Sequence, residues 1–188
     1  MSEEPDRAPR ASAVATGRGD DGTTGLLFGG DRIPKDDLRT EACGTLDETV
    51  AALGLARAEL EQKRQLDVLP PALDEIATLI LRIQRELFVA GAELAANPAA
   101  WERLRDGATK VSVAMVAGID AVLADYEARI SFPTEFVVPG ETRTSAALEL
   151  ARTILRRAER RDGAGAVYLV AATHRLQDLG VIARPSAR

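Results

Sequence analysis

The sequence predicts an all-α protein, a five-helix bundle, and three observations lead to that prediction. Aromatic residues make up only 4% of the chain while Ala and Leu are abundant, which favours helices because strands draw on β-branched and aromatic residues. Apolar residues recur at three- and four-residue spacing over several long segments, as on the buried face of a helix. Short Pro- and Gly-containing connections separate these segments, so we expect the helices to pack together as a bundle.

The net charge of the chain and its counts of Cys and His exclude several classes of function. The net charge of −5 argues against a general nucleic-acid binder. Cys43 is the only cysteine and His174 the only histidine, so an internal disulfide and a four-ligand Cys/His metal site are excluded. A Ser-His-Asp triad would have to use His174, and no G-x-S-x-G elbow accompanies it.

The chain of 188 residues fits a single domain. Residues 1–13 are polar and lack periodicity, so we expect a disordered tail followed by one domain over 14–188. The first residues are acidic and contain no apolar region, which argues against a secretory signal or a mitochondrial presequence. No apolar run approaches the roughly 20 residues needed to span a bilayer. We therefore expect a cytoplasmic protein without a membrane partner.

The first two helices follow a Gly-rich loop over 16–35. The first is expected to begin near Asp36 or Asp37, either of which can cap free backbone N–H groups. Its apolar face consists of Leu46, Val50, Leu53, Ala56 and Leu60. Pro70 and Pro71 begin the second, which runs to about Ala95. Its apolar face consists of Leu73, Ile76, Leu79, Ile80, Ile83, Leu87 and Phe88.

Three further helices complete the predicted bundle. A third helix is expected from about Thr109 to Ala128, with core positions Val111, Met115, Val122 and Tyr126. Residues 130–143 read as a loop with a short extended piece at 136–138. A fourth helix covers about 144–161 and buries Leu148, Ala151, Leu155 and Ala158. The fifth covers about 166–183.

The fourth helix carries a dense group of arginines. Because successive residues turn by about 100°, Arg152, Arg156 and Glu159 share one stripe, with Arg160 at its edge. This stripe could be a solvated face in which Arg156 and Glu159 form an ordinary i,i+3 pair. The density of guanidinium groups in an acidic chain favours a polyphosphate site instead. The five arginines are Arg152, Arg156, Arg157, Arg160 and Arg161.

The loop TGRGDDGTTG at 16–25 is the second candidate site. Its glycines would let the backbone approach a ligand and aim N–H groups at an anion. Thr23 and Thr24 add hydroxyl donors, and Lys35 adds a positive charge. The P-loop pattern GxxxxGK[ST] is absent, and a flexible surface turn is the alternative.

Asp47 is the third candidate, at the border of the apolar face of the first helix. A half-buried carboxylate at that position needs a cationic partner. The alternative is a simple acid on the helix surface.

Taken together, these segments resemble the PduO-type ATP:cob(I)alamin adenosyltransferases, whose patterns occur here in the family's order between residue 16 and about 184. The nucleotide loop, the E-A-x-G-T-x-D-E helix and the R-R-A-E-R helix carry most of the resemblance. The matching segments are TGRGDDGTT at 16–24, KDD at 35–37, EACGTLDE at 41–48, FVVPG at 136–140, ARTILRRAER at 151–160 and HRLQD at 174–178.

The resemblance implies a homotrimeric five-helix bundle with active sites between subunits. The ATP site of one subunit would use Thr16, Gly17, Arg18, Gly19, Asp20, Thr23, Thr24, Gly25 and Lys35. The neighbour would add Arg156, Arg157, Glu159 and Arg160, with His174 as a further ATP contact and Glu159 near an ATP-bound Mg²⁺. By the same resemblance Asp47, Phe136, Arg152 and Arg156 would be the catalytic residues, Asp47 pairing with Arg152 and Phe136 lying against the corrin ring.

The implied activity is transfer of the 5′-deoxyadenosyl group of ATP to cob(I)alamin, with a reductase and an adenosylcobalamin-dependent enzyme as expected partners. The chain departs from the family pattern in three of its motifs. Gly17-Arg18 replaces Lys-Thr, and Val50 and His174 each replace Asn. Two alternatives remain: a non-catalytic paralogue that carries ATP or adenosylcobalamin or regulates its delivery, and a helical trimer serving only as a scaffold.

Overall fold

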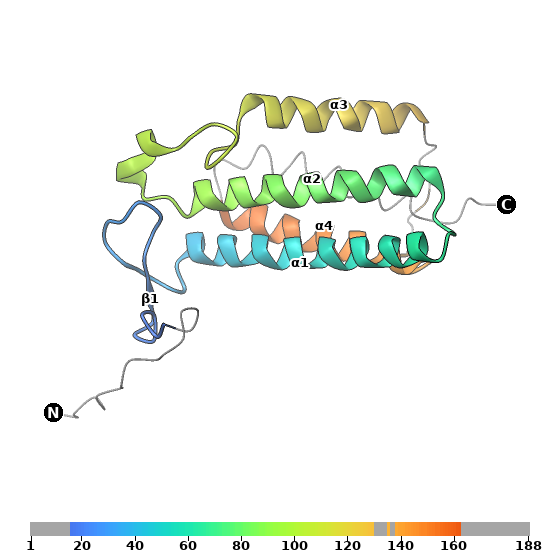
Figure 1. Cartoon of the computed structure of the whole chain (residues 1–188). Coiled ribbons are helices and arrows are strands. Elements are labelled where there is room, and N and C mark those ends of the chain that lie inside the picture. The colour runs from blue at the N-terminus through green and yellow to red at the C-terminus, as the bar shows by residue number, and fades with distance from the viewer. Residues whose placement is uncertain (1–15, 130–134, 136–137, 163–188) are drawn as a thin grey trace.

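A computed structural model describes residues 16–129, 135 and 138–162. Within these residues four α-helices lie side by side (Figure 1), which confirms the predicted all-α class. They are α1 (Leu38–Gln65), α2 (Pro71–Leu94), α3 (Val113–Arg129) and α4 (Arg143–Asp162). The tail expected over 1–13 and the fifth helix expected over 166–183 lie outside the described residues.

The ends of α1 and α2 follow from local chemistry. The Asp37 carboxylate accepts a hydrogen bond from the Arg39 backbone N–H at 2.8 Å and caps α1, as the sequence predicted. The α1 helix ends at Gln65, and α2 begins at Pro71. A proline fits the first turn because its missing N–H would have no partner within the helix.

The core lies between the apolar faces of the four helices. The largest fully buried side chains come from all of them, which confirms most of the predicted faces, although Val50, Leu73, Val111 and Val122 are only partly buried. They are Leu46, Leu53, Leu60, Ile76, Ile80, Ile83, Leu87, Ile119, Leu148 and Leu155. Burial of these side chains is the main stabilising contribution to the fold.

Two predictions about these helices were wrong. Phe88 was assigned to the core but is 60% exposed, because Leu87 occupies the core position and Phe88 lies about 100° further around α2. The third helix begins at Val113 rather than Thr109. Residues 105–110 form a turn in which the Thr109 hydroxyl accepts from the Arg105 N–H at 2.9 Å. Ser112 then supplies the cap, accepting from the Met115 N–H at 3.2 Å.

Two small elements were not predicted. A 3-10 helix, η1 (Pro98–Arg103), connects α2 to the turn before α3. Inside the Gly-rich loop, β1 (Thr23–Thr24) pairs antiparallel with β2 (Ile33–Pro34), so that Thr23 lies opposite Pro34 and Thr24 opposite Ile33. The loop is therefore a short hairpin.

The loop is attached to the C-terminal end of α2. The Leu27 N–H donates to the Ala95 carbonyl at 2.8 Å, and the Asn97 N–H donates to the Leu27 carbonyl at 3.0 Å. The Asn97 side-chain amide also donates to the Gly29 carbonyl at 2.9 Å. On the other side of this junction the Arg39 guanidinium donates to the Ala96 carbonyl at 2.7 Å. The bonds from Leu27 and Arg39 use the Ala95 and Ala96 carbonyls, which the end of α2 leaves without helical partners.

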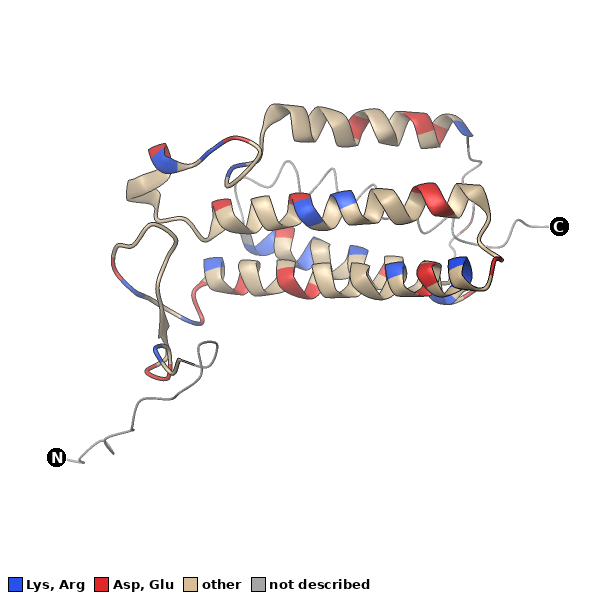
Figure 2. Ribbon diagram, viewed as in Figure 1, with Lys and Arg blue, Asp and Glu red and all other residues tan. Residues whose placement is uncertain are grey.

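Helices α1 and α4 run antiparallel. Charged pairs join them: Arg143 with Glu59 at 3.3 Å, Arg157 with Glu48, and Arg161 with Glu41 at 3.1 Å. Figure 2 shows that charged residues of both signs are distributed along the helices. The arginine-rich end of α4 therefore lies beside the start of α1, which directly follows the Gly-rich loop. None of the helices in the described ranges is both long and apolar enough to cross a membrane.

Candidate functional site

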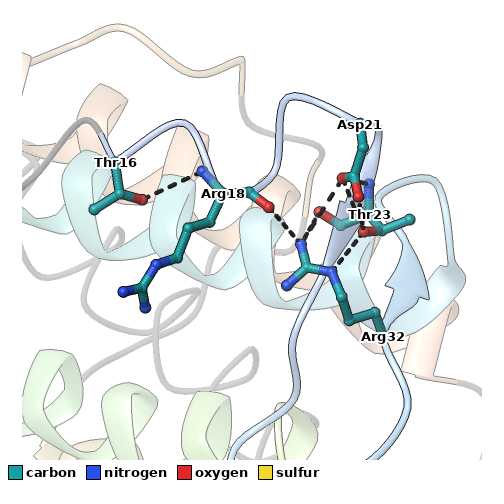
Figure 3. Close-up of polar contacts among 5 residues, drawn as sticks. All are labelled: Thr16, Arg18, Asp21, Thr23 and Arg32. Atoms are coloured by element: carbon teal, nitrogen blue, oxygen red, sulfur yellow. Dashed lines mark hydrogen bonds and ion pairs between the residues drawn. The ribbon is translucent and has the colours of Figure 1, made fainter. Parts of the chain in front are cut away.

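The hairpin of the Gly-rich loop is organised around Arg32 (Figure 3). Its Nε donates to the Thr23 hydroxyl oxygen at 2.7 Å, and one Nη donates to the carbonyls of Arg18 at 2.8 Å and Thr23 at 3.0 Å. The Thr23 hydroxyl and backbone N–H donate to the Asp21 carboxylate at 2.8 and 2.9 Å. The N–H and hydroxyl of Thr23, and then the charge of Arg32, lower the pKa of Asp21 below its usual value of 3.8.

Lys35 lies directly against Gly19. A Cβ added to Gly19 would be 2.9 Å from the Lys35 Nζ and 3.0 Å from the Thr23 carbonyl oxygen, so no larger residue fits without displacing the ammonium group. The Lys35 backbone N–H donates to the Gly22 carbonyl at 2.9 Å, which fixes the lysine at the hairpin. The glycine thus makes room for a positive charge next to exposed backbone, an arrangement suited to an anion.

Gly19→Ala is therefore expected to impair anion binding more than folding. The methyl group would push the flexible end of Lys35 away and would lie 3.0 Å from the Thr23 carbonyl oxygen, while the bonds from Arg32 to the Thr23 hydroxyl and to the Arg18 carbonyl would stay. We expect the dissociation constant for inorganic triphosphate, a model anion, to rise about tenfold, which corresponds to about 1.4 kcal/mol, with a melting temperature close to that of the wild type. Titration calorimetry measures the affinity, and thermal unfolding measures the stability. Gly22→Ala is no control, since Gly22 has φ +81°; Ala58→Ser on α1 is suitable. An unchanged triphosphate affinity would contradict the role given to the Lys35 ammonium.

Four of the arginines of α4 divide into two groups. Arg157 and Arg161 pair with Glu48 and Glu41 of α1 and so help to join two helices. Arg156 and Arg160 are exposed and form no ion pair within the described part of the chain. The solvated-pair alternative for Arg156 with Glu159 is thus not found there, and two guanidinium groups face outward at the end of the bundle near the hairpin.

A groove between α1 and α2 lies next to these elements. It has a volume of about 310 Å³ and includes Leu27 of the loop, Asp47, and the exposed ring of Phe88. The other lining residues are Cys43, Leu46, Val50, Leu87, Gly91, Ala92 and Ala95. Leu27 belongs to the same Gly-rich loop as the hairpin, so this loop contributes both to the groove and to the hairpin.

A family model for "Cobalamin adenosyltransferase" matches residues 14–175 of the sequence. The chain belongs to the cobalamin adenosyltransferase family. A corrinoid adenosyltransferase of Citrobacter freundii is 37% identical over 147 residues, covering 78% of this chain and 75% of the relative. A corrinoid adenosyltransferase of Bacillus subtilis is 40% identical, covering 78% of this chain and 68% of the relative.

Solved structures show the same fold in this adenosyltransferase family. Two variants of a PduO-type ATP:corrinoid adenosyltransferase from Lactobacillus reuteri, each complexed with cobalamin and ATP, align with TM-scores of 0.71 and 0.69. Sequence identity is 22% and 24%. The alignments cover 89% and 91% of this chain, and 88% and 91% of the respective neighbours.

The burial and the partner of Asp47 in this adenosyltransferase differ from the sequence prediction. The carboxylate was expected to be half-buried with a cationic partner, but it is exposed at the rim of the groove, because Leu46 takes the core position beside it. Arg152, its predicted partner, instead binds Glu149 of its own helix, with the Arg152 Nη2 at 2.8 Å and Nε at 3.0 Å from one carboxylate oxygen. A pairing of Asp47 with Arg152 between subunits stays a prediction.

The remaining predicted site residues of the adenosyltransferase lie mostly on the hairpin. Thr16 accepts a hydrogen bond from the Arg18 N–H at 3.4 Å, and the Asp20 N–H donates to the Gly17 carbonyl at 3.1 Å. Thr24 lies in β1, and Gly25 follows it. The side chain of Arg18 extends away from Arg32 (Figure 3). Phe136 and His174 lie outside the described residues.

Sequence reasoning missed Arg32, although it makes three of the bonds that shape the hairpin. Its only signal was a charged residue between a Gly-Gly pair and Lys35. The spacing of Arg32 from its acceptors, 14 residues to Arg18 and nine to Thr23, follows no helix or strand period and could not be recognised in the sequence.

Magnesium was also predicted. In the described ranges no group of three or more His, Cys, Asp or Glu side chains could hold a metal ion. Glu159 is half-buried on α4, next to Arg160. A single carboxylate fits Mg²⁺ that is held chiefly by phosphate oxygens and water rather than by a protein cage.

Proposed function

We propose that the chain transfers the 5′-deoxyadenosyl group of ATP to cob(I)alamin, giving adenosylcobalamin and triphosphate. The observation that carries this proposal is the Lys35 ammonium held against the backbone of Gly19, at the bundle end where Arg156 and Arg160 are exposed. Relatives named corrinoid adenosyltransferase, and solved neighbours of that kind complexed with cobalamin and ATP, support the same reaction.

The reaction is an alkyl transfer. The cobalt of cob(I)alamin, a substrate, donates an electron pair to the C5′ carbon of ATP. The cobalt–carbon bond forms as the C5′–oxygen bond breaks, and triphosphate leaves with the bonding pair. Negative charge therefore accumulates on the leaving oxygen, and fixed cations that meet it there lower the barrier. Lys35 and Arg18 of the hairpin, and Arg156 and Arg160 of α4, are exposed cations that would meet this charge.

The hairpin that carries Lys35 and the exposed arginines of α4 act together in an assembly of several copies of the chain. The guanidinium groups of Arg156 and Arg160 are exposed, and the hairpin extends away from the helices of its own chain (Figure 1). A homotrimer in which the hairpin of one copy faces the α4 stripe of the next would place both on one triphosphate. The same assembly would bring Asp47 to the neighbour's Arg152.

Magnesium bound to the triphosphate supplies further charge neutralisation during departure of the leaving group. Glu159 would hold one of its water or metal contacts, while Thr16, Gly17 and Thr24 contribute hairpin backbone and hydroxyl groups. Arg157 binds Glu48 in the single chain, so its contribution to ATP would require that pair to open.

Phe136 would control the ligation of the cobalt. An aromatic wall against the lower axial position keeps that position empty and makes cob(II)alamin easier to reduce. Phe136→Ala is expected to keep the KM for ATP and to slow adenosylation selectively when the assay starts from cob(II)alamin and a reductase. Rates measured from cob(II)alamin and from chemically reduced cob(I)alamin provide the comparison. Equal rates for wild type and variant from cob(II)alamin would remove this role.

An anaerobic assay tests the whole proposal. Purified protein is mixed with Mg-ATP and chemically reduced cob(I)alamin, and the product is followed by its visible spectrum and by chromatography. Adenosylcobalamin with a stoichiometric amount of triphosphate is the expected result. ATP binding without product would favour a non-catalytic carrier, and absence of ATP binding would favour a scaffold.

The localisation, the protein partners and the role of His174 complete the proposal. The enzyme would act in the cytoplasm, receive electrons through a reductase, and deliver adenosylcobalamin to an enzyme that depends on it. His174 would be an ATP contact in place of the family's Asn, and its neutral ring can both donate and accept a hydrogen bond.

A further inference from the structure

We propose that Arg32 is a positioning residue that holds the hairpin in its triphosphate-binding shape without contacting ATP itself; this inference rests on the proposed function. Arg32 lies in the second arm of the hairpin, directly before Ile33, the first residue of β2. Its guanidinium joins three points of the loop that are nine and 14 residues away in sequence.

The hydrogen bonds that Arg32 forms with other described residues are directed into the hairpin. The Nε binds the Thr23 hydroxyl at 2.7 Å, and the Nη2 binds the Arg18 carbonyl at 2.8 Å and the Thr23 carbonyl at 3.0 Å. The Asp21 carboxylate lies 3.8 Å from the same Nη2. The positive charge of Arg32 is thus opposed by a carboxylate, and its donors on this side are occupied by protein oxygens.

The Thr23 hydroxyl links Asp21 to Arg32. It has one proton, which it donates to Asp21 at 2.8 Å, and it accepts from the Arg32 Nε. A hydroxyl that already donates and accepts in this way has no second proton to offer a phosphate. Asp21, Thr23 and Arg32 therefore shape the hairpin, and the Thr23 hydroxyl, which was expected from the sequence to contact ATP, is occupied by Asp21 and Arg32 instead.

The bond to the Arg18 carbonyl orients the peptide that bears the Gly19 N–H. No cis peptide occurs in the described residues, and in a trans peptide the N–H points opposite to the C=O. Because the Arg18 carbonyl points toward Arg32, the Gly19 N–H points away from it. The Lys35 Nζ lies beside the same glycine. Arg32 thus turns a repulsive carbonyl away and leaves a backbone donor and an ammonium group for the anion.

The geometry requires a guanidinium rather than any cation. Nε and Nη2 are fixed in one plane and reach a hydroxyl and two carbonyls at once. A lysine ammonium is a single point with three rotatable donors and does not reproduce that fork. Arg32→Lys therefore keeps the positive charge but loses the planar fork that orients the loop. The variant separates the contribution of charge from the contribution of hydrogen-bond geometry.

The test compares Arg32→Ala, Arg32→Lys and a control, Arg143→Ala, in the full chain with Mg-ATP and cob(I)alamin. Arg143 is an exposed arginine at the opposite end of the bundle, paired with Glu59 at 3.3 Å. Loss of about two hydrogen bonds that orient the loop is expected to raise the KM for ATP about tenfold in both Arg32 variants. The kcat at saturating ATP, the KM for cobalamin and the melting temperature should stay close to wild-type values, and the control should match the wild type throughout.

A second readout reports on the hairpin itself. The amide signal of Gly19 in an NMR spectrum of labelled protein should shift when inorganic triphosphate is added to the wild type. The shift should be lost at the same triphosphate concentration in Arg32→Ala. A purely structural role would instead lower the melting temperature and change the KM values of both substrates.

Several results would overturn the inference. A wild-type KM for ATP in Arg32→Lys would mean that charge alone acts, and a wild-type KM in Arg32→Ala would mean that the hairpin needs no clamp. A fall in kcat with unchanged KM would make Arg32 part of the chemistry rather than of positioning. If the wild type forms no adenosylcobalamin, the proposed function fails, and calorimetric ATP affinities of the same variants still decide the role of Arg32: equal or absent binding in all of them refutes it.

Discussion

Arg156→Ala is expected to lower kcat about 100- to 1,000-fold, the range typical for removing one group that stabilises transition-state charge. The side chain is exposed and forms no ion pair in the described part of the chain. Its removal therefore breaks no ion pair between α4 and the other described segments, and the melting temperature should change little. The loss should appear in kcat more than in the KM for ATP, because charge on the leaving oxygen develops mainly in the transition state.

Single-turnover rates with cob(I)alamin and saturating Mg-ATP measure this effect without interference from reduction. Arg143→Ala removes the same charge from a residue that is exposed at the far end of the bundle and serves as the matched control. Arg156→Lys should recover only part of the rate, because an ammonium lacks the planar fork. Near-normal turnover in Arg156→Ala would refute its assigned role at the triphosphate.

Leu155→Ala is expected to lower the free energy of unfolding by about 2–5 kcal/mol, as for other large-to-small changes in a packed core. Leu155 is fully buried on α4 and belongs to the cluster that joins this helix to α1. The substitution removes apolar contacts and leaves a cavity that neighbouring helices fill only in part. The change also loosens the helix that carries Arg156, so activity should fall together with stability.

Urea unfolding at a fixed protein concentration provides the measurement, since self-association would shift the midpoint. Leu150→Ala is the matched control: the same substitution on the same helix, at a side chain that is 50% exposed. Its effect should stay below about 1 kcal/mol. Equal losses for the two variants would contradict the assignment of Leu155 to the core.

Most of the fold could be predicted from the sequence because the apolar residues of an amphipathic helix recur at a regular spacing. The apolar positions of α4, Leu148, Ala151, Leu155 and Ala158, are all buried as expected. The start of α1 at an Asp37 cap was also predictable from the residue type. Phe88 shows the limit of this reasoning, since a hydrophobic residue next to a core position can equally line an exposed groove.

The candidate site was predicted in composition but not in arrangement. The arginines of α4 were recognised as one cluster, whereas the structure assigns Arg157 and Arg161 to acids of α1 and leaves Arg156 exposed. Such pairings join residues about a hundred positions apart, and no local pattern records them. Asp47 was expected to be half-buried, and the exposed position depends on how far α1 is rotated against α2.

By itself the sequence determined the helical class, the places where most helices begin and end, the buried face of each, and the family motifs of the loop and of α4. These properties arise from interactions within a few residues: backbone capping, proline and glycine punctuation, and the 3.6-residue period. Only the tertiary structure decided that Arg32 clamps the hairpin, that Lys35 rests on Gly19, and which arginines remain exposed. Those facts depend on contacts between distant segments, whose geometry exists only once the core has brought the helices together.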